Sequence, residues 1–280
     1  MSQLIQMRQR IKAIQTIKKI THAMRLISMS LHARLKLKQG PLSTYKNTVT
    51  SIFHDIKKQS PQWNNHILYP AQTTFPKTLL IIVGANKGLC GNFNSALFKL
   101  VQTHKTEFTN LHYIAIGKKA IDFARQIQLG TEVAVYPTCT MNTLSTLVHG
   151  INKEIFTTAH HYTSVVVASN MLKNFFIQKP RLTHLIPFNQ DSAATTNELS
   201  EYVWEQDPSE ILHALAGQCI NATVQYLIFE SLLAEQAARF LSMDNSTRNA
   251  KNLLDETKLL YNKVRQAKIT KEITELSSSF

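Results

Sequence analysis

The last seventy residues of the chain, from Pro208 to Phe280, constrain the fold more than any other stretch. All eight prolines lie between Pro41 and Pro208, and the only glycine after Pro208 is Gly217. Long side chains with high helix propensity fill most of the segment. The segment is therefore predicted to form one helix of about 105 Å, at a rise of about 1.5 Å per residue.

Apolar side chains repeat along this segment in alternating steps of three and four residues. The repeat covers roughly seven heptads, more than the three or four that argue for a coiled coil. Such a rod is longer than a soluble domain is wide, so it needs a partner helix. The alternative, a globular bundle of shorter helices, lacks the internal Pro or Gly pairs that would mark its breaks. The positions of the repeat are Leu212, Leu215, Cys219, Ala222, Tyr226, Phe229, Leu233, Gln236, Phe240, Met243, Thr247, Ala250, Leu254, Thr257, Tyr261 and Val264.

The natural partner is the N-terminal helix predicted over residues 1–58. Its apolar positions are also spaced by three or four, which gives one apolar face and one basic face. The spacing slips once around Ile17, which would overwind a supercoil locally. Gly40-Pro41 predicts a kink. The apolar positions are Leu4, Met7, Ile11, Ile14, Ile17, Ile20, Met24, Ile27, Leu31 and Leu35.

Between the two helices the sequence alternates short β-branched runs with helical patterns. This alternation predicts right-handed βαβ units, and hence a mostly parallel, Rossmann-like α/β domain over residues 78–190. Residues 59–77 and 191–207 are expected as linkers, and Asp207 as the cap of a C-terminal helix over residues 208–280. An α/β domain inserted between two terminal helices requires those helices to pair antiparallel. The expected strands are Leu79–Val83, Leu111–Ile116, Val133–Tyr136, Val165–Ala168 and an edge strand Thr183–Phe188.

The net charge of +13 is concentrated at the front of the chain. Residues 1–54 hold ten Lys or Arg and no acidic residue, whereas the segment after Pro208 is neutral. An acid-free amphipathic N-terminus is also typical of a mitochondrial transit peptide, or of a helix that binds a membrane surface or nucleic acid. A solvated face, or one apposed to acidic protein, is the favoured interpretation. No apolar run reaches the length of a membrane span.

The Gly-rich loop over residues 84–94 is the best candidate for chemistry, because it follows the first strand directly. It matches neither the P-loop nor the dinucleotide fingerprint, so a structural turn at Gly88-Leu89-Cys90-Gly91 is favoured, with Asn94 capping the next helix. Cys90 has no assignable base and is expected to be a small buried residue. The scattered histidines predict no metal site. The sequence predicts no catalytic residue, metal or cofactor.

Four stretches in order resemble the gamma subunit of F-type ATP synthase. Residues 8–24, with R-Q-R-I and K-I-T-H-A-M, are similar to the family's I-R-x-R-I…K-I-T-x-A-M helix. Residues 88–94 are similar to its G-L-C-G-x-x-N turn. Residues 235–243 and 261–273 resemble its S-E-x-A-A-R-x-x-A-M and Y-N-x-x-R-Q-A-x-I-T-x-E-[IL] motifs. Because the match begins by residue 8, it leaves no room for a cleaved transit peptide and indicates a bacterial-type protein.

The resemblance implies a non-catalytic rotary shaft. Its antiparallel, left-handed coiled coil would stand inside a ring of three α and three β subunits. Rotation of a membrane ring of c subunits would turn it in a proton-translocating ATP synthase, with an epsilon subunit as a further partner. The implied place is peripheral, on the cytoplasmic face of the bacterial inner membrane, without insertion into the bilayer.

The resemblance also implies roles for single residues. Arg265 and Gln266 would contact a β-subunit loop, together with Thr270, and Met24 would lie near an acidic β loop. The family's Y-x-Y-E-P-D-P foot, which meets the c ring, corresponds to Tyr202, Trp204 and Glu205. Trp replaces Tyr in that foot and Gln206 replaces Pro.

One further departure is Arg25, which stands where the family commonly has Glu. Structural alternatives remain open for two of the assignments. Met24 is equally consistent with a coiled-coil core position, and Tyr202 and Trp204 with the core of the α/β domain.

Two other functions fit parts of the sequence. A basic coiled-coil arm that binds nucleic acid would interleave aromatic residues with its cations, and residues 1–44 contain none. An α/β enzyme with a dimerisation arm would need a recognisable site, which the loop over residues 84–94 does not provide.

Overall fold

The computed structural model describes residues 2–71, 76–156, 162–188 and 206–278. It contains two long helices, α1 (Ser2–Gln59) and α5 (Pro208–Ser278), and a five-stranded sheet with its own helices between them in the sequence. The chain divides into two compact units. One unit combines residues 1–30 with residues 239–280, and the other is formed by residues 31–238.

The two long helices are unbroken within their bounds. Asp207 precedes α5, and its Oδ1 accepts a hydrogen bond of 3.0 Å from the backbone N–H of Ser209, as expected of a helix cap. Pro208 occupies the first helical position, where a missing N–H costs nothing. α1 continues through Gly40 and Pro41 rather than ending there. The single C-terminal helix predicted from the absence of Pro and Gly is confirmed.

The sheet has the strand order β3-β2-β1-β4-β5. β1 pairs in parallel with both β2 and β4, and β2 pairs in parallel with β3. β5 is antiparallel to β4 and forms one edge. The mostly parallel sheet predicted from the alternating pattern is therefore confirmed. The strands are β1 (Thr78–Val83), β2 (Leu111–Ile116), β3 (Thr131–Tyr136), β4 (Ser164–Asn174) and β5 (Ile177–Ile186).

The expected edge strand Thr183–Phe188 was placed too late in the chain. β5 begins at Ile177 because β4 runs on to Asn174 and the two strands form a hairpin. Asn174 Oδ1 accepts hydrogen bonds from the backbone N–H groups of Phe176 and Ile177, at 3.0 and 2.8 Å, which closes the turn. The polar residues of this hairpin do not show the β-branched pattern from which the other strands were predicted.

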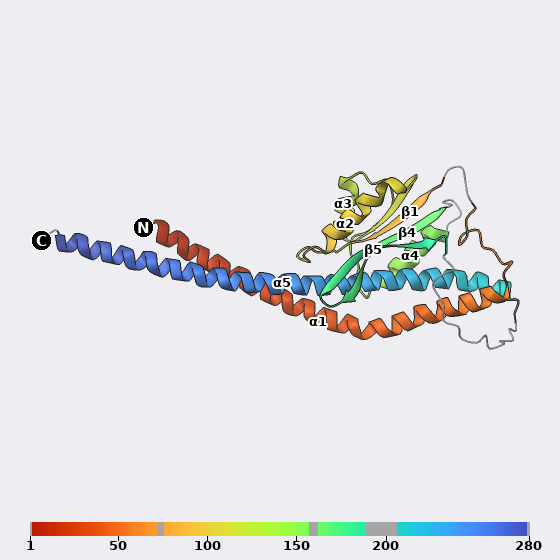
Figure 1. The fold of residues 1–280 in the computed structure, drawn as a ribbon, viewed down its shortest axis with the longest axis horizontal. Helices are drawn as coiled ribbons and strands as arrows, with labels where there is room; N and C mark the ends of the chain where they lie inside the picture. The colour runs from red at the N-terminus through yellow and green to blue at the C-terminus, as the bar shows by residue number, and fades with distance from the viewer. Residues whose placement is uncertain (1, 72–75, 157–161, 189–205, 279–280) are drawn as a thin grey trace. The chain divides into compact units, whose positions relative to one another are not determined.

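Alternate residues of the central strands face two different layers. Leu80 and Ile82 pack with the helices α2 (Phe93–His104) and α3 (Lys118–Gln126). Leu79 and Ile81 face the opposite layer, which contains α4 (Leu144–Phe156) and α5 (Figure 1). The 3₁₀ helix η1 (Lys105–Glu107) follows α2. Since both faces of the sheet are covered, the strands are apolar on both sides.

Segments of α1 and α5 belong to the core of the larger unit. Phe53 of α1 and Phe229 of α5 are fully buried together with the sheet residues. Residues 60–71, which were expected as linker, contribute the buried side chains of Trp63 and Leu68. The α/β layer therefore shares its core with the long helices.

Between Leu227 and Ala238 nearly every residue of α5 is buried, including the carboxylate of Glu230. Arg181 on β5 donates a hydrogen bond of 2.8 Å from Nη2 to Glu230 Oε2. Burial raises the pKa of Glu230, and the positive charge of Arg181 acts against that rise. The ammonium of Lys46 on α1 lies 5.2 Å from the ring centroid of Tyr226. A polar cluster thus links the edge of the sheet to α1 and α5 within this unit.

Two glycines provide a matched test of this fold. Gly117 has φ of 86°, and an added Cβ would lie 2.3 Å from the carbonyl oxygen of Gly84. Gly217 lies in α5 with open space around its Cα. We expect Gly117→Ala to lower the free energy of unfolding by about 2 kcal/mol or more, and Gly217→Ala to raise it by about 0.5–1 kcal/mol. Urea unfolding followed by circular dichroism measures both, and equal effects would contradict the assigned backbone conformations.

Candidate functional site

The loop between β1 and α2 is a turn held by its own side chains. Asn94 Oδ1 accepts a hydrogen bond of 2.9 Å from the backbone N–H of Ala85, and its Nδ2 lies 3.2 Å from Cys90 Sγ. Leu89 and Gly91 have positive φ angles of 64° and 57°. Because the amide of Ala85 is already bonded to Asn94, it is not directed at a phosphate.

The expectation that Asn94 caps α2 is wrong. The cap position is Asn92, whose side chain makes no capping hydrogen bond, and Asn94 lies inside the first turn of the helix. Its side chain points back to the loop, where the N–H of Ala85 and the thiol of Cys90 need partners. Asn94 therefore closes the turn instead of starting the helix.

The turn packs against α5 of the same unit. Cys90, only 2% exposed, and Phe93 form a small buried cluster with Ala234 and Ala238. Two alanines one helical turn apart give the loop room to approach the helix closely. Gly88 has open space around it, and Leu89 is exposed at the tip. Cys90 is thus buried against a helix and not presented as a nucleophile.

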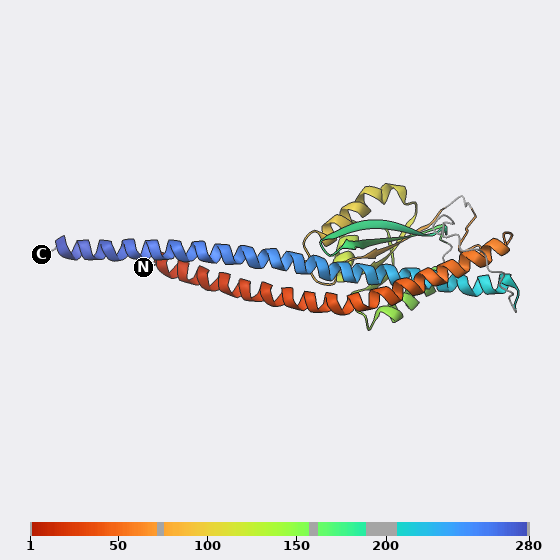
Figure 2. The same ribbon diagram turned by 60° about the horizontal axis from the view of Figure 1, so that its bottom comes forward.

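The other candidate surface is the unit formed by residues 1–30 and 239–280, where α1 and α5 run side by side (Figures 1 and 2). Arg8 Nε donates a hydrogen bond of 2.7 Å to the hydroxyl of Tyr261. Ile14 is buried with Ala250 and Leu254. Each later residue of α1 meets an earlier residue of α5, so the two segments are antiparallel.

The repeat predicted for α5 agrees with its burial in this unit. All of its positions here are buried or half-buried, namely Phe240, Met243, Thr247, Ala250, Leu254, Thr257, Tyr261 and Val264. Beyond Lys268 every described residue of α5 is exposed. The C-terminal end therefore reaches past the segment that α1 covers.

The repeat predicted for α1 is wrong at Ile17, Ile20 and Ile27, whereas its positions Ile14 and Met24 are buried and half-buried. Ile17, Ile20 and Ile27 are 53%, 56% and 53% exposed. From Ile14 to Ser28, the other buried and half-buried positions of α1 are Lys18, Thr21, Met24, Arg25 and Ser28. The steps of three and four continue without a slip, but the positions are mostly polar, and apolarity alone therefore predicted the wrong face.

Two of the polar positions of α1 have hydrogen-bond partners on α5, whereas the Ser28 hydroxyl bonds to the carbonyl of Met24 in its own helix. Thr247 Oγ1 donates a hydrogen bond of 2.9 Å to Thr21 Oγ1. Arg25 Nη1 donates one of 2.7 Å to Asp244 Oδ1. The sequence does carry a signal for this face, because polar residues that can pair, Thr21 with Thr247 and Arg25 with Asp244, stand at facing positions of the two helices.

Asp244 lies between two arginines. Its Oδ1 contacts Arg25, and its Oδ2 pairs with Arg248 of the next turn of α5 at 2.8 Å. Its side chain is 15% exposed. The hydrogen bond from Arg25, followed by the charges of both arginines, holds the pKa of Asp244 below its usual value. A partly buried ion pair of this kind fixes the axial register of two helices.

The residues expected to contact partners lie at two levels of this unit. Arg265, Gln266 and Thr270 are exposed on α5, and Gln266 and Thr270 are one turn apart. Met24 is half-buried on α1, next to Arg25, which pairs with Asp244. Asp244 and Arg265 are separated by about 30 Å of helix, so Met24 is not near the other three. Tyr202, Trp204 and Glu205 lie outside the described residues.

The same unit exposes two apolar stripes. Ile17, Ile20 and Ile27 form one on α1, and the half-buried Met24 lies at its border. The other runs along the end of α5, where Ile269, Ile273 and Leu276 are 47%, 62% and 64% exposed. Exposed apolar stripes of this length are typical of interfaces. The geometry therefore favours a binding surface for other proteins along this unit.

Two structural findings concern other classes of function. No helix among the described residues is long and apolar enough to span a bilayer. In the same part of the chain, no three His, Cys, Asp or Glu side chains gather as a metal ion would require.

Comparisons with known proteins give one consistent family. The sequence profile described as ATP synthase matches residues 3–280. The ATP synthase gamma chain of Buchnera aphidicola subsp. Melaphis rhois is 27% identical over 99% of this chain and 97% of its own length. The ATP synthase gamma chain of Chlorobium limicola is 30% identical over 99% and 97%.

A solved structure is similar in fold along almost the whole length. A chain in the cryo-EM structure of the Euglena gracilis mitochondrial ATP synthase, OSCP/F1/c-ring in rotational state 3, aligns with a TM-score of 0.68. The alignment covers 99% of this chain and 93% of that one, at 14% identity. At that identity the likeness concerns the fold.

Asp244→Asn tests the ion-paired register. We expect it to lower the free energy of unfolding at pH 7 by about 1–2 kcal/mol, because two charge-assisted hydrogen bonds lose their anion. The pKa of Asp244 is lowered on folding, so its contribution is present above about pH 4 and is lost as the pH falls through the folded-state value. Wild-type stability should therefore fall more than that of Asp244→Asn between about pH 5 and pH 2. Asp255→Asn, an exposed position on α5, is the control, and identical pH profiles for all three proteins would contradict the assignment.

Proposed function

Since the chain belongs to the ATP synthase gamma-chain family, we propose that it is the central rotary shaft of a proton-translocating F-type ATP synthase. In this role the chain is a non-catalytic subunit. It couples rotation of a membrane ring to ATP synthesis or hydrolysis carried out by other subunits. The observation that carries the proposal is the unit of two antiparallel helices whose α5 segment extends beyond α1 with apolar side chains exposed.

The helix pair is proposed to be an antiparallel, left-handed coiled coil. The steps of three and four on α5, together with the matching contacts of Arg8, Thr21 and Arg25 on α1, support this packing. A shaft has to transmit torque without bending. The unbroken α5 and the ion-paired register suit that demand.

The partners are proposed to be three α and three β subunits around the shaft, an epsilon subunit, and a ring of c subunits at the membrane. The α/β domain over residues 78–190, joined through residues 59–77 and 191–207, would form the head at the ring. Tyr202, Trp204 and Glu205 are proposed as its contact with the c subunits. The complex would lie on the cytoplasmic face of a bacterial inner membrane, with this chain as a peripheral component.

The β-subunit contacts are proposed at both levels of the helical unit. Arg265 and Gln266 would hydrogen-bond to carboxylates of a β loop, with Thr270 one turn further. Met24, next to the exposed stripe of Ile17, Ile20 and Ile27, would face a second β loop. Acidic surfaces of the α and β subunits around the shaft would attract the basic, acid-free residues 1–54.

Reconstitution tests the proposed function. The purified chain is mixed with its cognate α and β subunits, and the complex is assayed for stoichiometry and for MgATP hydrolysis. We expect one copy of the chain per six subunits, hydrolysis that depends on its addition, and none by the chain alone. If this complex does not form and the chain binds nucleic acid instead, the proposal is wrong. The chain would then be a nucleic-acid-binding protein with a basic coiled-coil arm.

Arg265→Ala with Gln266→Ala tests the proposed β contact. Both residues are exposed, so the helix should remain intact and its circular dichroism unchanged. Loss of a charge-assisted contact is expected to lower ATP hydrolysis by the assembled complex roughly 10-fold. Lys263 is an exposed cation on the same helix, and Lys263→Ala should leave ATP hydrolysis by the complex near the wild-type rate. An equal effect of the two variants would show that only total charge matters.

A further inference from the structure

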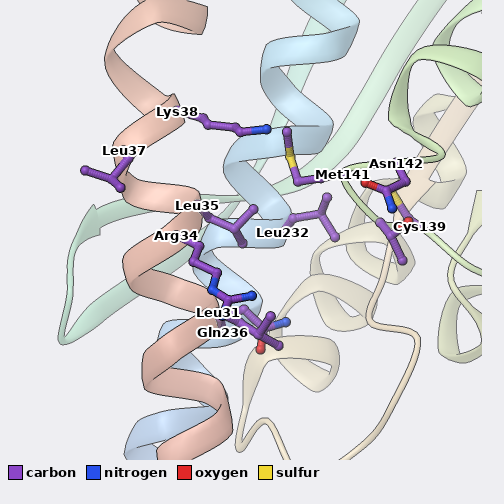
Figure 3. A pocket seen from close by; sticks show the side chains of 11 residues that line it. Leu31, Arg34, Leu35, Leu37, Lys38, Cys139, Met141, Asn142, Leu232 and Gln236 are labelled. Atoms are coloured by element: carbon purple, nitrogen blue, oxygen red, sulfur yellow. The ribbon is translucent and has the colours of Figure 1, made fainter.

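A cavity of about 710 Å³ lies within the unit of residues 31–238, between α1, α5 and the loop that joins β3 to α4 (Figure 3). None of the roles proposed above uses it. Its volume is in the range of sites for small organic molecules, about 300–1,000 Å³. Its residues come from three separate elements, so the cavity depends on the folded unit.

The middle of the cavity is apolar. Figure 3 shows the side chains of Leu35, Leu232 and Met141 gathered there, with Cys139 on the side of the loop. Leu232 and Cys139 are buried, while Leu35 and Met141 are half-buried. An apolar part of a bound molecule would thus be removed from water on contact with these side chains, which favours binding.

Two cations stand at the rim. Arg34 and Lys38 lie one turn apart on α1, and Figure 3 shows them extending toward α5 on either side of Leu35. No acidic residue lines the cavity. Neither cation forms an ion pair with any residue in the described part of the chain, and α1 has no acidic residue before Asp55. Positive potential at this rim is therefore not neutralised from its own helix.

Glu235 of α5 does not line the cavity but lies close to Cys139, which does. Its charge adds to the effect of burial in raising the pKa of the Cys139 thiol. A negative group of a ligand would be attracted to the two cations at the rim. The arrangement has a direction, with the apolar part inside and the anion outside.

We propose that this cavity binds a single-chain anionic amphiphile, a medium-chain carboxylate of the fatty-acid type. Its chain would lie against Leu35, Leu232 and Met141, and its carboxylate between Arg34 and Lys38. The limited volume favours one short chain over a folded protein segment. The inference concerns a ligand and does not rest on the shaft role.

Alkylation of Cys139 in the full-length chain reports occupancy. Burial, followed by the charge of Glu235, raises the pKa of this thiol to about 12, so the reaction with iodoacetamide is slow and a ligand above it slows it further. Peptide mass spectrometry follows all three cysteines, and Cys90 and Cys219, buried elsewhere, are internal controls. We expect decanoate, below its micellar concentration, to protect Cys139 alone.

The charge requirement is tested with ligands and with variants. Decyltrimethylammonium, which has the same chain and the opposite charge, should give no protection, and neither should inorganic phosphate. Arg34→Glu and Lys38→Glu are expected to raise the decanoate concentration for half-protection at least about 10-fold. Lys36→Glu makes the same charge change on the same helix at a position that does not line the cavity, and should have no effect.

Several results would overturn the inference. Equal protection by both decyl compounds would mean that the chain binds without recognition of the anion. Protection by phosphate alone would indicate a simple anion site, and protection only by phosphatidylglycerol vesicles would indicate a membrane surface. Absence of protection by decanoate in wild-type protein, with an unchanged circular dichroism spectrum, would leave no amphiphile site.

Discussion

The fold is organised around covering the repeat of mostly apolar side chains along α5. A helix of 71 residues with apolar positions every three or four residues is stable in water only where that seam is covered. In the unit of residues 1–30 and 239–280 the antiparallel segment of α1 covers it. In the unit of residues 31–238 the sheet and α1 cover the repeat of α5, and between Leu227 and Ala238 nearly every residue of the helix is buried. The sheet, the turn at Cys90 and the cluster around Glu230 all attach to the same helix.

In the unit of residues 1–30 and 239–280, α1 packs against α5 largely with polar residues and exposes several apolar ones. Its α1 seam uses Thr21, Arg25 and Ser28, while Ile17, Ile20 and Ile27 face outward. Polar partners such as Asp244 fix the register of the two helices, because a shift by one turn would separate the charges. The exposed isoleucines are then free to contact other proteins. Register and partner binding are thus assigned to different faces of one helix.

Much of this fold could be predicted from the sequence. The positions of Pro and Gly predicted the unbroken α5, and its steps of three and four identified the buried face correctly. The β-branched runs predicted the parallel strands. Three predictions were wrong, since Asn94 does not cap α2, the α1 repeat does not slip, and β5 starts at Ile177. The face of α1 depends on polar side chains whose partners are distant in sequence, β5 on a turn within a polar stretch, and Asn94 on hydrogen bonds back into its own loop. Apolar periodicity carries no information about any of these.

The most direct test of the central claim is the rotation of this chain within an assembled complex. The α and β subunits are fixed to a surface, a probe is attached to the α/β domain through an introduced cysteine, and MgATP is added. If the chain is the rotary shaft, the probe turns in one direction in three equal steps per revolution, at a rate that follows ATP hydrolysis. A probe that stays still while ATP is hydrolysed at the full rate would contradict it.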